Sequence, residues 1–184
     1  MTSQSLDINS NDLIHWFNAI RNLPNNERTR ALDATWSGQI QSKAWLVNCL
    51  KPLVTIDSNA YIFGGWIGLL ANLMFQNLPI KKIRSIDIDP WCESVADMVN
   101  KPYEMNNWRF KSITCDMMNY EYDYDITSDI VINTSSEHID QSTYDNWFDK
   151  IHHNSLIVVQ GNNFFDCHEH IRCSTDLNNF ENMN

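Results

Sequence analysis

Three of the five glycines follow one apolar run, Tyr61-Ile62-Phe63, and an aspartate lies about twenty residues further on. Gly64, Gly65 and Gly68 form a glycine-rich turn, which lets the backbone approach a ligand closely and points helix N–H groups at it. Asp87 ends the next apolar run, where a carboxylate can accept hydrogen bonds from two ribose hydroxyls. Together these features predict a site for a nucleoside cofactor. A tight turn without a ligand and a capped loop are the plain structural alternatives.

A second acid follows the third apolar run. Asp116 precedes Met117 and Met118, and a carboxylate beside a soft apolar side chain can bind the amino group and the face of an adenine. The alternative is a solvated loop acid next to core methionines. We add Met117 and Ile88, the residue after Asp87, to the expected cofactor-binding set.

A polar segment, Asn133-Thr134-Ser135-Ser136-Glu137-His138, follows the fourth apolar run. Open α/β sheets place ligands beyond the carboxyl ends of their strands, so this segment predicts catalytic or binding side chains. His138 is expected to act as a general base near neutral pH. Glu137 is expected to orient it or bind substrate, and Asn133 to contribute to both the catalytic and the cofactor site. The alternative is a loop whose polar side chains satisfy turn backbone.

A fourth group of chemically active residues lies near the end of the sequence. Cys167, His168, His170 and Cys173 fall within one short segment, and Cys and His are the usual zinc ligands. Their spacing matches no common zinc pattern, so we interpret them as a polar segment and predict no metal site.

The elements that must position these residues alternate in type. After Asn59 short apolar runs alternate with helical stretches, a pattern typical of βαβ units and a parallel sheet. The strands are expected at 61–63, 83–88, 110–115, 130–132 and 156–159. Helices are expected at 66–76, 91–100 and 144–151, with Asp89 as N-cap and Pro90 in the first turn of the second. Runs that are apolar on both sides of the strand indicate a sheet covered on both faces.

The sequence before this region is predicted to be helical. Ser10 is expected to cap a helix with Leu13, Ile14, Phe17 and Ile20 on one face, and a second helix is expected from about Gly38 to Leu50. We therefore predict one domain over 1–184, with a helical cap at 1–52 and an α/β core at 53–184. The fold class is a doubly wound, mostly parallel Rossmann-like sheet.

Composition limits the partners. The chain has 184 residues and a net charge of -10, with 23 acidic against 13 basic residues and no run of lysines or arginines. This argues against nucleic acid as the substrate and favours a small molecule or a protein segment. No apolar run reaches the roughly 18–20 residues of a membrane span, and the N-terminus does not resemble a signal peptide. Five irregularly spaced cysteines are typical of reduced thiols, so a cytoplasmic location is expected.

Residues 59–162 resemble class I S-adenosylmethionine-dependent methyltransferases. The resemblance rests on 61–68, on Ser85-Ile86-Asp87-Ile88-Asp89-Pro90, on Cys115-Asp116-Met117 and on Ile130-Val131-Ile132-Asn133. More narrowly, the 36–43 and 133–138 segments are similar to those of small methyltransferase-like proteins of phages and bacteria. The resemblance implies S-adenosylmethionine as cofactor, with the three glycines at its methionine part, Asp87 at its ribose and Asp116 at its adenine.

The sequence departs from the family's pattern at two positions. Ile62 stands where an acidic residue usually opens the glycine motif, and Trp66 replaces its middle glycine. The loop after Ile132 also lacks the Asn/Asp-Pro-Pro-aromatic motif of amino-methyltransferases, so we do not expect DNA base methylation. A non-catalytic methyltransferase-fold binding protein and an NAD-binding protein are the alternative functions.

The region after the last strand is short compared with the family. The family's sheet normally ends in two further strands, and only 25 residues follow Val159 here. We expect those strands to be lacking. The strand at 156–159 would then form an exposed edge, which favours pairing with another chain. We expect either reduced stability with a tendency to associate or a homodimer that pairs with or covers this edge.

Overall fold

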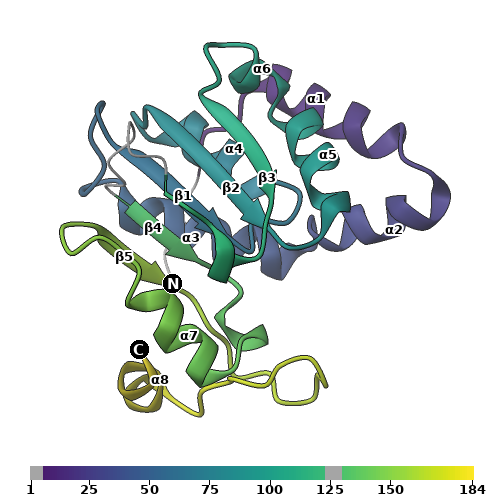
Figure 1. The fold of residues 1–184 in the computed structure, drawn as a ribbon. Coiled ribbons are helices and arrows are strands. Elements are labelled where there is room, and N and C mark those ends of the chain that lie inside the picture. Colours follow the sequence, from purple (N-terminus) through teal and green to yellow (C-terminus); the bar gives the residue numbers. More distant parts are fainter. Residues whose placement is uncertain (1–5, 123–129) are drawn as a thin grey trace.

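The computed structural model describes residues 6–122 and 130–184, and these contain a five-stranded sheet (Figure 1). The strands are β1 (Asn59–Phe63), β2 (Lys82–Asp87), β3 (Phe110–Thr114), β4 (Ile130–Asn133) and β5 (Leu156–Val159). Their order is β3-β2-β1-β4-β5, and every pairing is parallel. This is the order of a Rossmann-type sheet, so the predicted fold class is confirmed.

Alternate side chains of the central strands enter two separate hydrophobic cores. Ala60 and Ile62 of β1 belong to the larger core, whereas Tyr61 and Phe63 belong to the smaller one. Successive side chains of a strand point to opposite faces, so helices or loops must cover both faces of this sheet.

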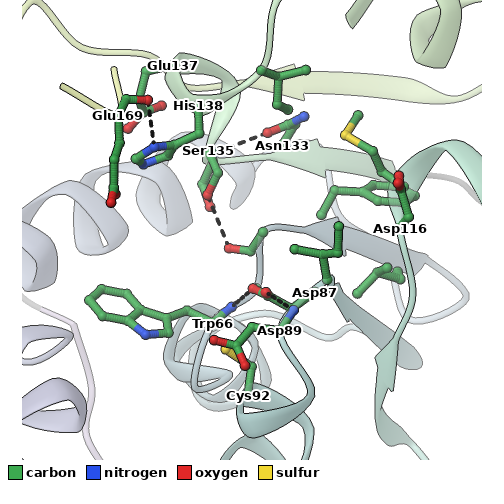
Figure 2. A pocket seen from close by; sticks show the side chains of 18 of the residues that line it. Trp66, Asp87, Asp89, Cys92, Asp116, Asn133, Ser135, Glu137, His138 and Glu169 are labelled. Carbon is green, nitrogen blue, oxygen red and sulfur yellow. Dashed lines mark hydrogen bonds between the residues drawn. The ribbon is translucent and has the colours of Figure 1, made fainter. Parts of the chain in front are cut away.

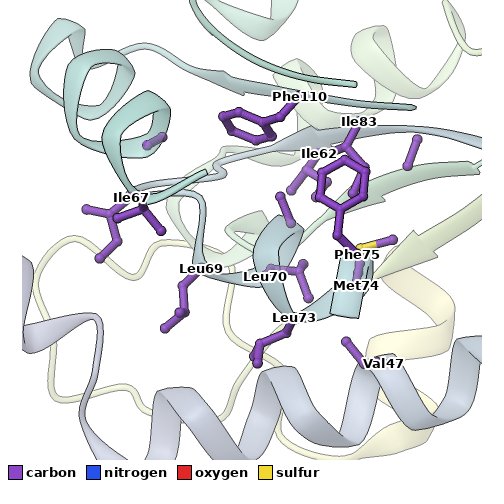
Figure 3. Packing of buried hydrophobic residues seen from close by; sticks show 14 of the residues in the cluster. Val47, Ile62, Ile67, Leu69, Leu70, Leu73, Met74, Phe75, Ile83 and Phe110 are labelled. Atoms are coloured by element: carbon purple, nitrogen blue, oxygen red, sulfur yellow. The ribbon is translucent and has the colours of Figure 1, made fainter. Parts of the chain in front are cut away.

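The larger core lies between the sheet and the helices of the first half of the chain. These are α1 (Ser10–Arg21), α2 (Asn25–Asp33), α3 (Ser37–Leu50), α4 (Leu69–Asn77) and α5 (Pro90–Val99), followed by the short α6 (Lys101–Glu104). α4 carries seven buried residues, from Leu69 to Phe75, and forms the centre of this layer (Figure 3). α5 begins as predicted, because the Asp89 side chain accepts a hydrogen bond from the backbone N–H of Trp91 and Pro90 occupies the first turn.

The smaller core covers the opposite face. α7 (Gln141–Phe148) contributes the fully buried Tyr144 and Trp147, and two short 3₁₀ turns, η1 (Met117–Asn119) and η2 (Ser136–His138), lie at the ends of the neighbouring strands. Phe63 and Trp147 meet edge to face, with ring centroids 5.4 Å apart. This second covered face makes the sheet doubly wound.

The helical N-terminus is present, although two details of its prediction were wrong. Asn9 rather than Ser10 caps α1, through a hydrogen bond from Asn11 N–H. Ile14 and Phe17 are 56% and 68% exposed, because α1 packs on α5 through the Trp16 and Ile20 side of the helix. Periodicity alone cannot decide which of two apolar stripes meets a neighbour.

The helix α2 was not predicted. Its sequence is strongly polar, and Ala31 is its single buried residue. Its side chains instead contact the start of α5: Glu27 accepts a hydrogen bond from the Trp91 indole N–H at 2.9 Å, and Arg30 forms an ion pair with Asp89. The residues at 1–5 of the predicted cap lie outside the described residues.

Residues 160–184 contain loops and one short helix, α8 (Leu177–Met183), and no strand. Within the described part of the chain, β5 therefore forms one edge of the sheet and pairs only with β4. All four β5 residues are half-buried. The homodimer through this edge stays a prediction. No helix in the described ranges has the length and apolarity needed to cross a membrane.

Candidate functional site

A cavity of about 770 Å³ opens at the carboxyl ends of β1, β2, β3 and β4 (Figure 2). Phe63 at the end of β1 pairs with Asn133 at the end of β4, and here the chain connections diverge to the two sides of the sheet. Such a topological switch point is where open α/β sheets bind ligands. The volume lies within the range of about 300–1,000 Å³ that is typical of small-molecule sites.

Most of the residues singled out from the sequence line this cavity. They are Gly64, Gly65, Asp87, Ile88, Asp116, Met117, Asn133, Glu137 and His138. Gly68 does not line it. Gly68 is the N-cap of α4 with a φ of 71°, and an added Cβ would meet Asn100 Nδ2 at 2.5 Å, so glycine is needed there for packing of α4 against α5.

The glycine turn is folded back onto β2. Gly64 and Gly65 donate backbone hydrogen bonds to the Ile86 carbonyl, at 2.9 and 3.2 Å. Gly64 has a φ of 67°, and a Cβ there would lie 2.3 Å from Ser135 Oγ, in the loop after β4. The sequence predicted that these glycines let the backbone approach a ligand closely. The structure shows that Ser135, in the loop after β4, occupies the space that a side chain at Gly64 would need.

Trp66 also adopts a left-handed conformation, with a φ of 50°. A side chain is strained there, which fits the position where the family's motif carries glycine. Its backbone N–H donates to Asp87 Oδ2 at 2.9 Å, and its side chain lines the cavity opposite Glu137 and His138 (Figure 2).

Asp87 joins the glycine turn to the loop after β2. Its Oδ2 accepts from Trp66 N–H, and its Oδ1 accepts from Asp89 N–H at 3.1 Å. A carboxylate has about four acceptor sites, so both oxygens retain capacity for a ligand hydroxyl. The side chain is thus held rigidly at the cavity wall.

The residues expected to contact an adenine lie beyond the end of β3 and on the loop after β2. Asp116 Oδ1 accepts a hydrogen bond from Met118 N–H at 2.8 Å and so caps η1. Met117 is half-buried, and Ile88 is 69% exposed on the facing loop. The two apolar side chains therefore provide surface on which a planar group can lie.

Asn133 is fully buried at the end of β4. Its Oδ1 accepts from Ser135 N–H at 3.0 Å, whereas its Nδ2 finds no hydrogen-bond acceptor in the described residues. A buried donor without an acceptor is costly, and in a cavity wall it favours a bound ligand.

Two cavity residues from α3 were not assigned a role from the sequence. Lys43 and Gln39 of α3 line the cavity, and Lys43 Nζ donates to Gln39 Oε1 at 2.7 Å. Burial lowers the pKa of Lys43 to about 8, because desolvation disfavours the ammonium form. Both residues lie in the Trp36–Lys43 segment that carried part of the family resemblance, so a signal was available.

Cys92 at the start of α5 also lines the cavity, and its pKa is raised to about 12 by burial and by the nearby carboxylates of Asp87 and Asp89. The thiol therefore stays protonated near neutral pH and is a poor nucleophile.

Glu137 and His138 lie in η2, across the cavity from the glycine turn (Figure 2). His138 is exposed, and its Nδ1 lies 3.2 Å from the Glu169 carbonyl. Of the Cys/His segment, His170 reaches this group, with its ring centroid 4.8 Å from that of His138.

No protein-family model matches the chain, and no curated protein matches it in sequence. Several solved structures match in fold. Small RNA methyltransferase HEN1 is 17% identical with a TM-score of 0.62, covering 78% of this chain and 20% of its own. The methyltransferase PaMTH1 of Podospora anserina, bound to S-adenosylhomocysteine, is 14% identical with a TM-score of 0.52, covering 83% of this chain and 62% of its own.

A third structure is geranyl diphosphate C-methyltransferase of Streptomyces coelicolor A3(2), in complex with Mg²⁺, geranyl diphosphate and S-adenosylhomocysteine. It is 10% identical with a TM-score of 0.52, covering 72% of this chain and 50% of its own. The chain thus spans between 20% and 62% of the lengths of these structures. At such identities the likeness shows the fold, which is that of Rossmann-like methyltransferases.

Proposed function

We propose that this protein binds S-adenosylmethionine and transfers its methyl group to an acceptor. The observation that carries the proposal is the cavity at the switch point, whose lining combines Gly64, Asp87, Asp116 and Asn133 from four successive strand ends. Two of the three structures compared above are bound to S-adenosylhomocysteine, the demethylated product, which supports the same cofactor here.

Each part of the cofactor has a matching part of the cavity wall. Asp87 accepts the ribose hydroxyls, Asp116 accepts from the adenine amino group, and Met117 and Ile88 cover the adenine faces. The backbone of Gly64 and Gly65 faces the methionine part, and Asn133 Nδ2 donates to the ligand. Gly68 acts indirectly, by fixing the start of α4.

Lys43 supplies a cation for the methionine carboxylate. Arg30, which also lines the cavity, is already engaged by Asp89 and lies over the Trp91 ring, whereas Lys43 donates a hydrogen bond to the neutral Gln39. A half-buried ammonium beside a cavity gains more from an anionic ligand than an exposed one does.

Binding through Lys43 predicts a distinctive pH dependence. The free protein has a Lys43 pKa of about 8, and a bound carboxylate favours the charged form and raises that pKa. Affinity for S-adenosylhomocysteine should therefore be constant below about pH 8. Above it, affinity should fall by up to about tenfold per pH unit, because binding then requires uptake of a proton. Calorimetry across pH 6.5–9.5 measures this.

The matched variants are Lys43→Met and Lys51→Met, which alter a cavity lysine and an exposed lysine next to the same helix. Lys43→Met should lower affinity at pH 7 by roughly 10–100-fold and flatten the profile, since a charged hydrogen bond contributes about 1.5–3 kcal/mol. Titration of the ligand's own amino group is common to both variants. Identical profiles for the two would contradict the carboxylate role.

Catalysis would come mainly from placing the sulfonium methyl in line with the acceptor. His138 acts as the general base where the acceptor loses a proton, with Glu137 orienting or binding the substrate, and Asn133 contributes from the end of β4. We propose a small molecule or a protein segment as acceptor, because the chain is acidic and has no lysine or arginine run.

A ligand panel tests the function. S-adenosylmethionine or S-adenosylhomocysteine at 100 times its dissociation constant should stabilise the fold by about 2.7 kcal/mol, seen as a rise in melting temperature. NAD should have no effect. A shift with NAD alone would favour the dinucleotide alternative, and no shift with any of the three would favour a non-catalytic relative of the fold.

A further inference from the structure

Two imidazoles and a carboxylate gather at the side of the cavity opposite the glycine turn. One potential ligand atom from each of Glu137, His138 and His170 lies within 4.8 Å of the other two. Glu137 and His138 belong to η2, whereas His170 comes from the segment between β5 and α8. The cluster is thus assembled by the fold from distant parts of the sequence.

Both imidazoles are oriented with Nε2 available. His138 Nδ1 lies 3.2 Å from the Glu169 carbonyl oxygen, and His170 Nδ1 lies 2.9 Å from the Phe164 carbonyl oxygen. A carbonyl accepts and cannot donate, so each Nδ1 carries a proton, and the neutral form of each ring then presents its lone pair at Nε2. A backbone carbonyl on the far ring nitrogen is the arrangement that orients metal-bound histidines.

Only one oxygen of the Glu137 carboxyl group has a hydrogen-bond partner among the described residues. Asn162 Nδ2 donates to Oε1 at 2.8 Å, which fixes the carboxylate plane. Oε2 is buried and has no hydrogen-bond partner among the residues that the structure describes. A buried carboxyl oxygen without a partner is costly unless a cation or a donor meets it.

The segment that carries His170 is tied to Glu137 by its backbone. Ile171 and Arg172 donate backbone hydrogen bonds to the Glu137 carbonyl, at 2.8 and 3.0 Å, and Ser174 donates to the carbonyl of Asn162 at 3.1 Å. Arg172 is itself buried and stacks on Tyr144. His170 is therefore held beside η2 by a network that does not involve its own side chain.

We propose that Glu137 Oε2, His138 Nε2 and His170 Nε2 bind one divalent transition-metal ion. Two imidazoles and one carboxylate suit Zn²⁺ or Co²⁺ better than Mg²⁺ or Ca²⁺, which prefer oxygen ligands. Bonds of 2.0–2.2 Å require ligand atoms about 3–3.5 Å apart. The donor atoms lie within 4.8 Å of one another, so they must move closer together when the ion binds. Three protein ligands leave at least one position open towards the cavity.

This site revises two expectations. The sequence predicted no metal, because Cys167, His168, His170 and Cys173 have no zinc-like spacing, and the new donor set takes only His170 from them. Nε2 cannot ligate an ion and accept a proton at once, so the general-base role proposed for His138 applies only to the metal-free protein. The donor set differs from the residues proposed to hold S-adenosylmethionine, so either proposal can fail alone.

The test is a titration of chelator-treated protein with Zn²⁺ alone by calorimetry and with Co²⁺ alone by visible absorption. One ion per chain is expected to bind. Glu137→Gln and His170→Ala should each weaken binding by more than about 100-fold. Loss of a residue that only hydrogen-bonds to a metal ligand typically lowers metal affinity about 10–100-fold, and loss of the ligand itself should cost more. His168→Ala, which removes an exposed histidine two residues away, should leave affinity unchanged.

Circular dichroism and S-adenosylhomocysteine binding, measured on the same metal-free variants, check the fold and the cofactor site separately. Glu137→Gln keeps the size of the side chain and an acceptor for Asn162, so it tests the site without disturbing the loop. Absence of stoichiometric binding would overturn the proposal. Equal affinities for His170→Ala and His168→Ala would overturn it as well.

Discussion

Replacing Asp87 by alanine is expected to lower the affinity for S-adenosylmethionine and S-adenosylhomocysteine by roughly 10²–10⁴-fold. The carboxylate would lose two hydrogen bonds from ribose hydroxyls, each contributing about 1.5–3 kcal/mol because the acceptor is charged. Calorimetric titration of both ligands measures the effect. The fold should persist, since the strand pairings of β2 do not depend on this side chain.

The same carboxylate also holds Trp66 N–H and Asp89 N–H, so affinity could fall through the turn rather than the ribose. A thermodynamic cycle separates the two causes: the wild-type protein and Asp87→Ala are each titrated with S-adenosylhomocysteine and with its 2′-deoxyribosyl analogue. The effects of the substitution and of the missing hydroxyl are non-additive only if Asp87 contacts that hydroxyl directly. The wild-type protein should prefer the ribosyl ligand, and Asp87→Ala should show little preference. An equal preference in both proteins would reject the ribose contact.

Replacing His138 by alanine is expected to lower turnover by about 10²–10⁴-fold once an acceptor is known, the range typical of a lost general base. S-adenosylhomocysteine affinity should barely change, because His138 lies across the cavity from the glycine turn (Figure 2). Single-turnover methyl transfer with saturating cofactor measures the loss. Parallel losses in turnover and cofactor affinity would indicate a structural histidine.

Turnover alone does not distinguish a base from a metal ligand, but the metal titration does. As a base, His138 can be removed without changing Zn²⁺ affinity, and activity in the wild-type protein survives chelation. As a ligand, its removal weakens Zn²⁺ binding to the same extent as His170→Ala. We expect the second result, because Glu137 and His170 each place a further potential ligand atom within 4.8 Å of the one on His138.

The sequence predicted the sheet well because each strand is encoded locally. A run such as Ile130-Val131-Ile132 is apolar on both sides, which only a strand covered on both faces tolerates. The five strands and the three helices between them appear at the expected places, with ends displaced by a few residues. The polar α2 gave no such signal, because its function is to hold α5 through Glu27 and Arg30.

The sequence by itself also predicted that the candidate-site residues lie at one edge of the sheet. In a parallel sheet the residues after every strand meet at the carboxyl end, so Gly64, Asp87, Asp116 and Asn133 had to lie near one another. Their order along the chain then fixed which one follows which strand. No knowledge of side-chain packing was required for this step.

Only the tertiary structure decided what each residue contacts. Gly64 is confined by Ser135, Lys43 reaches the cavity from the helical cap, and His170 returns from beyond β5 to meet Glu137 and His138. These contacts join residues that are far apart in the chain, and their spacing reflects intervening loops rather than the geometry of the site. A local pattern predicts where a chain turns, but the neighbours of a turn depend on how whole elements pack.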